Sequence, residues 1–230
     1  MGNRTSTVNV NEELNGSIDD IFKLIFRPDD KNTYALIRAH IINYPTSLDR
    51  IVYCTGLDKN DDYDTKYAYY GTPLLLATRY SKKYSSVEIV KLLIEIGANV
   101  NQRVKYPTYC NDCHSSQSMT PLIIACIFAD ITSNKETIDI LLKAGANVNM
   151  KGCCKTPLLQ VCLNLCKCNI DVIQTLLENE ANTDIYYNHK IWCYRHVDYE
   201  KRTAYDVLTQ SPTTQLKLKA KEILDKHCLK

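Results

Sequence analysis

Two cysteines and a histidine stand close together at residues 110–114, which read CNDCH. A Cys-x-x-Cys-His pattern is typical of c-type haem attachment, and a Cys-x-x-Cys pair is half of many zinc sites. The pattern lies within a long insertion, residues 102–118. The next loop along the chain contains two adjacent cysteines, Cys153 and Cys154. If the two segments stand side by side, four thiolates could bind one tetrahedral zinc ion: Cys110, Cys113, Cys153 and Cys154.

Three observations weigh against a metal centre. Haem attachment needs an exported, oxidising setting, and the N-terminus lacks the apolar core of a signal peptide. Adjacent cysteines such as Cys153 and Cys154 rarely both bind one ion without strain. His114 could replace one of these ligands, but a loop in a cysteine-rich chain explains the stretch equally well. We therefore interpret 110–114 as part of a loop and expect no cofactor, with zinc as the alternative.

The composition narrows the class of protein. The chain has 230 residues, of which 45% are hydrophobic and 23% charged, and its formal net charge is +2. This balance gives no reason to expect a nucleic-acid or membrane partner. The eleven cysteines of a chain without a signal peptide indicate a reducing compartment, so we expect a cytoplasmic protein. Abundant Asn, Lys, Ile and Tyr suggest an AT-rich genome, such as that of a large DNA virus or a protist.

The first six residues fit the pattern for N-terminal myristoylation, which would acylate Gly2 after removal of the initiator methionine. A single acyl chain anchors only weakly without a basic patch, and Glu12 and Glu13 do not provide one. We therefore expect no stable association with membranes.

Three segments of the chain repeat one ordered set of landmarks. Each begins with Thr-Pro-Leu, at Thr72, Thr120 and Thr156, where the threonine can cap a helix whose first residue is proline. A second apolar stretch follows at helical spacing. It ends near Gly97 in the first segment, and in the third segment Glu180 stands where the others have glycine. A left-handed backbone at Glu180 would cost about 1 kcal/mol.

These landmarks resemble the ankyrin repeat, and the resemblance covers residues 71–184 firmly. One departure is the histidine that usually follows Thr-Pro-Leu, which is replaced by Leu75, Ile123 and Leu159. The resemblance implies an all-α solenoid of stacked helix pairs with extended β-hairpin-like fingers. It also implies a non-enzymatic adaptor that binds another protein.

The expected organisation follows from the repeat and from weaker signals at the two ends. A short helix is also expected within the first part, over residues 47–54. The expected segments are residues 1–16, a flexible N-terminus; 17–70, a degenerate capping repeat with a long finger; 71–118 and 119–154, ankyrin repeats; 155–201, an ankyrin repeat with a long finger; and 202–230, a C-terminal capping repeat.

The expected function follows from the resemblance to the ankyrin repeat and not from a catalytic motif. We recognise no P-loop, no GxGxxG and no HExxH pattern, so we expect no enzyme activity. The expected protein is a monomeric adaptor that binds its partner through the concave face and the fingers of the solenoid. We expect it in the cytoplasm, or in the host cytoplasm if the source is viral. The alternative is a zinc-stabilised binding module that carries the cysteine cluster on adjacent fingers.

Aromatic residues concentrate in the presumed fingers, and Tyr, Trp and Arg dominate interface hot spots. The alternative is that long fingers fold back and that their aromatic rings cover the edges of the repeats. The candidate partner-binding residues are Tyr67, Tyr69, Tyr106, Tyr109, Tyr187, Trp192, Tyr194 and Arg195.

Asn101 and Asn149 each have a leucine eight residues upstream, a pattern similar to that of ankyrin-directed asparaginyl hydroxylation. The favoured alternative is that these asparagines stabilise the turn after the second helix.

Overall fold

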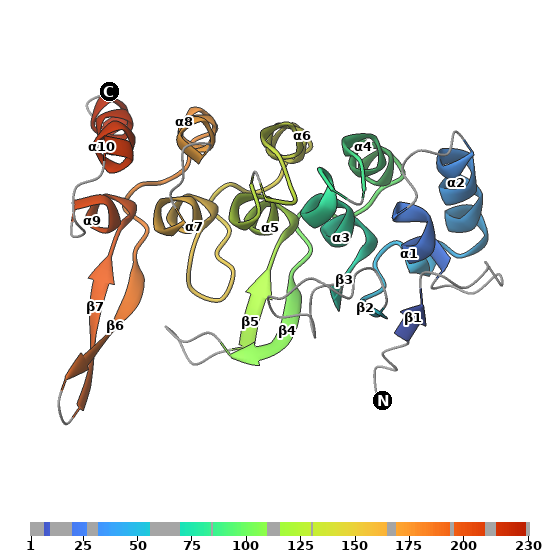
Figure 1. Ribbon diagram of the computed structural model, residues 1–230, viewed down its shortest axis with the longest axis horizontal. Helices are drawn as coiled ribbons and strands as arrows, with labels where there is room; N and C mark the ends of the chain where they lie inside the picture. The colour runs from blue at the N-terminus through green and yellow to red at the C-terminus, as the bar shows by residue number, and fades with distance from the viewer. Residues whose placement is uncertain are drawn as a thin grey trace.

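The computed structural model describes residues 7–9, 20–26, 32–55, 70–83, 85–109, 116–129, 131–164, 169–193, 196–209 and 215–228. In this part of the chain ten α-helices form five consecutive pairs, which stack in one row (Figure 1). The all-α solenoid expected from the sequence is confirmed. The first helices of the pairs are α1 (Asp20–Ile25), α3 (Pro73–Tyr80), α5 (Pro121–Ile127), α7 (Pro157–Leu163) and α9 (Ala204–Thr209). The second helices are α2 (Thr33–Asn43), α4 (Val87–Glu95), α6 (Lys135–Lys143), α8 (Asn169–Glu178) and α10 (Gln215–Cys228).

Short strands project from the row of first helices, on the side away from the second helices (Figure 1). Two antiparallel hairpins form there, which confirms the expected hairpin-like fingers. A third, three-stranded sheet has β2 in its centre, parallel to β1 and antiparallel to β3. The strands are β1 (Thr7–Asn9), β2 (Val52–Thr55), β3 (Tyr70–Gly71), β4 (Val104–Tyr109), β5 (Ser116–Met119), β6 (Tyr187–Cys193) and β7 (His196–Arg202).

The three Thr-Pro-Leu threonines cap their helices as expected. Thr72, Thr120 and Thr156 each accept a hydrogen bond of 3.3 Å from the backbone N–H three residues later. Thr203 has no following proline, but it exchanges hydrogen bonds with Asp206 and caps α9 in the same manner. Each cap satisfies a backbone donor that would otherwise be buried without a partner.

The core runs continuously along the row because neighbouring pairs share it. α3 packs on α5, α5 on α7 and α7 on α9, while the second helices α4, α6, α8 and α10 also contact one another in sequence. The three residues that replace the family's histidine are fully buried: Leu75 and Ile123 are 0% exposed and Leu159 is 1% exposed. At these positions the chain therefore uses apolar packing in place of an imidazole.

Two expectations for the N-terminal part are wrong. A helix was expected over residues 47–54, but the chain forms a 3₁₀ turn at Pro45–Ser47 and then strand β2. The run Ile51-Val52-Tyr53 favours a strand, since β-branched and aromatic residues fit a pleated surface. The flexible N-terminus expected over residues 1–16 is contradicted only at Thr7–Asn9, which pairs with β2; the rest of that range lies outside the described residues.

Glu180 has φ = 65°, as its place in the repeat predicts, and Gly97 and Gly145 also have positive φ. This left-handed conformation costs a residue with a Cβ roughly 1 kcal/mol or more, whereas glycine adopts it freely.

We therefore predict that Glu180→Gly raises the free energy of unfolding by about 1 kcal/mol in chemical denaturation. The matched control is Glu180→Ala, which keeps the Cβ and should change stability by less than about 0.5 kcal/mol. An equal gain in both variants would show that the side chain, and not the backbone conformation, is responsible.

Candidate functional site

Asparagine side chains hold consecutive fingers side by side. The Asn101 side chain donates from Nδ2 to the Gly145 carbonyl (3.0 Å) and accepts at Oδ1 from the Asn147 N–H (2.8 Å). Asn101 thus bridges the turn after α4 and the turn after α6 with two hydrogen bonds. Both groups it contacts are backbone groups, so the contact depends on the position of the next finger and not on its side chains.

Asn149 repeats the same bridge one unit later. Its Nδ2 donates to the Glu180 carbonyl (3.0 Å), and its Oδ1 accepts from the Asn182 N–H (2.7 Å). Three consecutive turns are therefore joined at a fixed spacing. Hydroxylation of Asn101 and Asn149, the less favoured of the two interpretations from the sequence, stays a prediction; the bridges show both side-chain amides in contact with neighbouring turns.

The finger between α6 and α7 is short, and it packs against the β4–β5 hairpin. The Arg103 guanidinium donates to Ser118 Oγ (3.2 Å) and to the Gly152 carbonyl. A Cβ at Gly152 would lie only 2.5 Å from the Ser118 carbonyl oxygen, so glycine is needed for this close approach.

On its other side the short finger contacts the base of the β6–β7 hairpin. Lys151 Nζ donates to the Tyr186 carbonyl (3.0 Å) and lies 5.4 Å from the centroid of the Tyr186 ring. Lys201 Nζ, from β7, lies 4.7 Å from the same centroid. Lys155 Nζ lies 5.1 Å from the centroid of the Tyr187 ring. The short finger and the base of the β6–β7 hairpin therefore meet in one cluster of cationic and aromatic side chains.

Tyr186 and Tyr187 have opposite environments. Tyr187 is 3% exposed and belongs to the core, so its assignment as a partner-binding residue is wrong. Tyr186 is 40% exposed. Neighbouring residues of an extended strand point to opposite faces, so a Tyr-Tyr pair at the start of a hairpin should place one ring inward and one outward. That signal could have directed attention to Tyr186.

The other candidate residues fall at or beyond the edge of what the structure describes. Tyr106 and Tyr109 lie on β4 and Trp192 on β6, but their side chains are not among those described. The roles assigned to these residues stay predictions. Outside the described residues altogether are Gly2, Tyr67, Tyr69, Cys110, Cys113, Tyr194 and Arg195.

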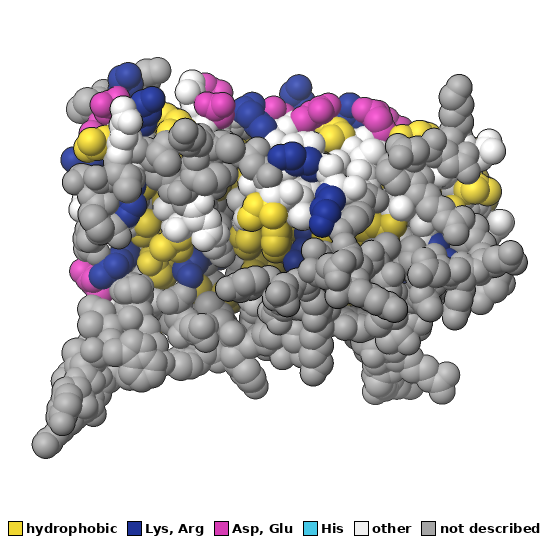
Figure 2. All heavy atoms as spheres, viewed as in Figure 1, with side chains coloured by type: hydrophobic (Ala, Val, Ile, Leu, Met, Phe, Trp, Pro, Cys, Tyr) yellow, Lys and Arg dark blue, Asp and Glu magenta, His cyan; other side chains and the backbone are white. Residues whose placement is uncertain are grey.

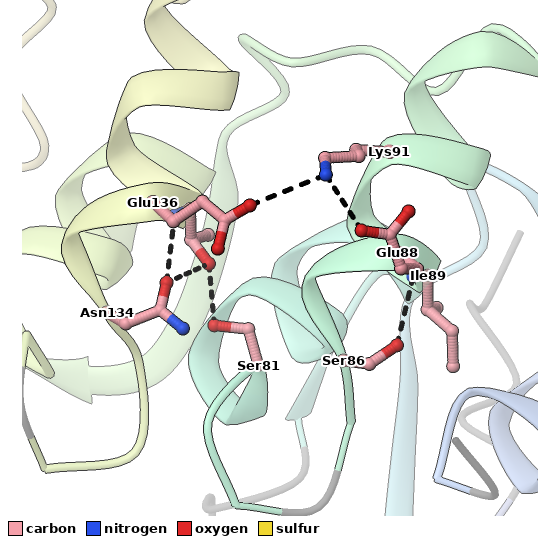
Figure 3. Close-up of polar contacts among 8 residues, drawn as sticks. Ser81, Ser86, Glu88, Ile89, Lys91, Asn134 and Glu136 are labelled. Carbon is pink, nitrogen blue, oxygen red and sulfur yellow. Dashed lines mark hydrogen bonds and ion pairs between the residues drawn. The ribbon is translucent and has the colours of Figure 1, made fainter. Parts of the chain in front are cut away.

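The second helices present a different surface, on which charges are paired across neighbouring helices. Lys91 on α4 contacts Glu88 (2.8 Å) and also Glu136 on α6 (3.4 Å) (Figure 3). Arg38 on α2 contacts Glu95 on α4 at 2.9 Å, beside a shallow pocket between these two helices. Figure 2 shows acidic and basic side chains alternating along this row. Such exposed pairs add little stability, but they leave little unbalanced charge.

Beneath these charges a polar network connects two repeats. Thr137 Oγ1 lies 2.7 Å from Ser81 Oγ and donates to Asn134 Oδ1 (2.9 Å), while Asn134 caps α6 by accepting from the Thr137 N–H (Figure 3). Ser81 and Thr137 are both buried, at 5% and 0% exposed. The hydroxyls satisfy one another inside the stack, which indicates a structural role.

The described cysteines separate into two kinds. Cys126 and Cys162 are buried, at 0% and 1% exposed, and pack within the hydrophobic core. Burial raises the pKa of the Cys126 thiol far above its usual range and raises the pKa of Cys162 to about 12. Cys153 and Cys154 are half-buried, with their Sγ atoms 3.8 Å apart. Since Cys110 and Cys113 lie outside the described residues, the zinc site stays a prediction; the described side chains alone contain no group of three metal ligands.

Comparison with known proteins identifies the repeated unit. The sequence model of the ankyrin repeat matches residues 71–105 and 117–153. The solved ankyrin repeat domain of human ASB11 aligns with a TM-score of 0.50 at 18% identity, over 96% of this chain and 73% of that chain. At this identity the likeness concerns the fold alone. No match is found among curated proteins. Over the described residues, no helix has the length and apolar character needed to cross a bilayer.

The raised thiol pKa values lead to a prediction about reactivity. Alkylation requires the thiolate, so in folded protein at about pH 8 Cys126 and Cys162 should remain unmodified by iodoacetamide. Peptide mapping by mass spectrometry measures this, with Cys153 and Cys154 of chelator-treated protein as the reactive comparison. Modification of Cys162 at the rate of Cys153 would contradict the burial described here.

The same shifts predict a pH dependence of stability. A pKa that is higher in the folded than in the unfolded state stabilises the fold below the unfolded value of 9.0, and this stabilisation is lost as pH rises further. The free energy of unfolding should therefore fall from pH 9.0 towards about pH 12. In the variant Cys126→Ala/Cys162→Ala, which lacks these two buried thiols, this fall should be smaller.

Proposed function

Because the chain is an ankyrin-repeat protein, we propose that it is a non-enzymatic scaffold that binds a partner protein through its finger side. The finger side is the face formed by the first helices and the hairpins. Ankyrin repeats generally mediate interactions between proteins, and stacked repeats offer an extended surface for this purpose. No chemistry beyond binding is needed to explain the arrangement of the described side chains.

One observation carries the choice of face. On the second-helix row, cations such as Arg38 and Lys91 already contact carboxylates of neighbouring helices. On the finger side, Asn101 and Asn149 hold successive fingers at fixed spacing, and an exposed tyrosine lies beside two lysines. A surface that is ordered before binding loses less conformational entropy when a partner arrives. The finger side is therefore the better prepared for recognition.

The proposal extends to the cellular compartment of the protein and to the kind of organism that encodes it. The AT-rich residue composition supports a large DNA virus or a protist as the source, and the cysteine content supports a reducing compartment. For a viral source the partner is a host protein in the cytoplasm. Cell fractionation of the expressed chain tests the compartment.

Site-specific photo-crosslinking tests the choice of face. We predict that a photoreactive phenylalanine analogue at Tyr199 on β7 forms a covalent adduct with a partner protein in lysate of the source or host cell. The control position is Leu218 on α10, in the same C-terminal part of the solenoid. The two side chains have nearly equal exposure, 49% and 48%, so reagent access does not distinguish them.

An adduct from position 199 but not from position 218, identified by mass spectrometry, is the expected result. An adduct from 218 alone would place the partner on the second-helix row and would contradict the proposal.

A further inference from the structure

Two lysines from different fingers converge on one exposed ring. The ammonium groups of Lys151 and Lys201 lie 5.4 and 4.7 Å from the centroid of Tyr186, so they are at most about 10 Å apart. That upper bound is comparable to the Debye length, about 8 Å at physiological ionic strength, so the positive potentials of the two lysines are only partly screened from each other. Both lysines are exposed, and Tyr186 is 40% exposed.

The position of this pair is fixed by the finger stack. Lys151 is anchored by its hydrogen bond to the Tyr186 carbonyl, and its finger is held to β5 by Arg103. Lys201 lies opposite Asn188 in the regular register of β6 and β7. The face of the tyrosine ring attracts both cations, but a neutral ring offsets their charge only in part.

The acidic side chains described in this finger do not form ion pairs with Lys151 or Lys201. Glu200 is engaged by Arg202, whose Nε lies 2.9 Å from its carboxylate. Asp184 makes no ion pair with Lys151 or Lys201 among the described contacts. On the second-helix row, by contrast, Lys91 contacts two glutamates. Among the residues that the structure describes, no carboxylate is bound to either ammonium group, so a carboxylate that approaches Tyr186 can contact both.

We propose that Lys151, Lys201 and Tyr186 bind a carboxylate-rich segment of the partner protein. The proposal rests on the proposed function and names the chemistry of its partner. Two cations and a tyrosine suit a short stretch with one or two acidic residues. Nucleic-acid binding depends on neutralising several successive phosphates, and the chain as a whole carries a net charge of only +2.

The direct test measures binding of a fluorescein-labelled decaglutamate peptide by fluorescence anisotropy at physiological ionic strength. We predict that the wild-type chain binds this probe and that Lys151→Glu/Lys201→Glu weakens binding by about tenfold or more. Tyr186→Ala should weaken binding too, whereas Tyr186→Phe, which keeps the ring, should retain it.

The matched control is Lys143→Glu/Lys219→Glu. Lys143 and Lys219 are exposed lysines of the second-helix row, on α6 and α10, and the double change alters the net charge by the same amount. This variant should bind decaglutamate as the wild type does. Thermal unfolding of every variant verifies the fold, and Lys151→Gln/Lys201→Gln replaces the charge-reversed variant if that one is destabilised.

Three results would overturn the inference: no binding of decaglutamate by the wild type, equal weakening by the two double variants, or tighter binding of labelled decathymidylate than of decaglutamate. The crosslinking experiment separates this inference from the proposed function. If position 199 still forms its adduct while decaglutamate does not bind, the partner's acidic character is wrong and the choice of face stands.

Discussion

A single helix pair of this chain cannot bury its apolar side chains within itself. Leu75 on α3 and Ile123 on α5 are fully buried, and the helices that carry them pack on each other across the boundary between two repeats. Each such side chain contributes about 1.5–3 kcal/mol when it is removed from water. The stability of any pair therefore depends on its neighbours, and the pairs must lie in chain order.

This linear order also arranges the fingers. Because each pair follows the last at a constant spacing, the same asparagine can reach the next turn each time, as Asn101 and Asn149 do. The finger side and the second-helix row then differ in whether their charged side chains are paired. Lys91 and Glu136 neutralise each other across second helices, whereas Lys151 and Lys201 share only a tyrosine ring. The second-helix row thus pairs part of its charge between neighbouring helices, whereas Lys151 and Lys201 on the finger side form no ion pair among the described contacts.

Local signals made much of the fold predictable from the sequence. Thr72-Pro73 specifies a capped helix start within a few residues, and the place of Glu180 in the repeat predicts the positive φ that this residue adopts. Strand β2 was missed although its run Ile51-Val52-Tyr53 favours a strand, because the partners that complete the sheet, Thr7–Asn9 and Tyr70–Gly71, lie outside this segment of the sequence. Tyr187 was assigned to the surface because the packing of the hairpin base, and not residue type, decides which of two adjacent tyrosines enters the core. The cluster of Lys151 and Lys201 could not be predicted from the sequence, because only the stacking of the fingers brings these two lysines together.

The central claim is that asparagine bridges align the fingers into one recognition surface. The most direct measurement is amide hydrogen exchange of Asn149→Ala beside the wild type. The account predicts faster exchange at residues 182–187, beginning with the Asn182 N–H that Asn149 accepts, while α3, α4 and α5 keep their protection. Unchanged exchange at 182–187, or an equal increase throughout the chain, would contradict it.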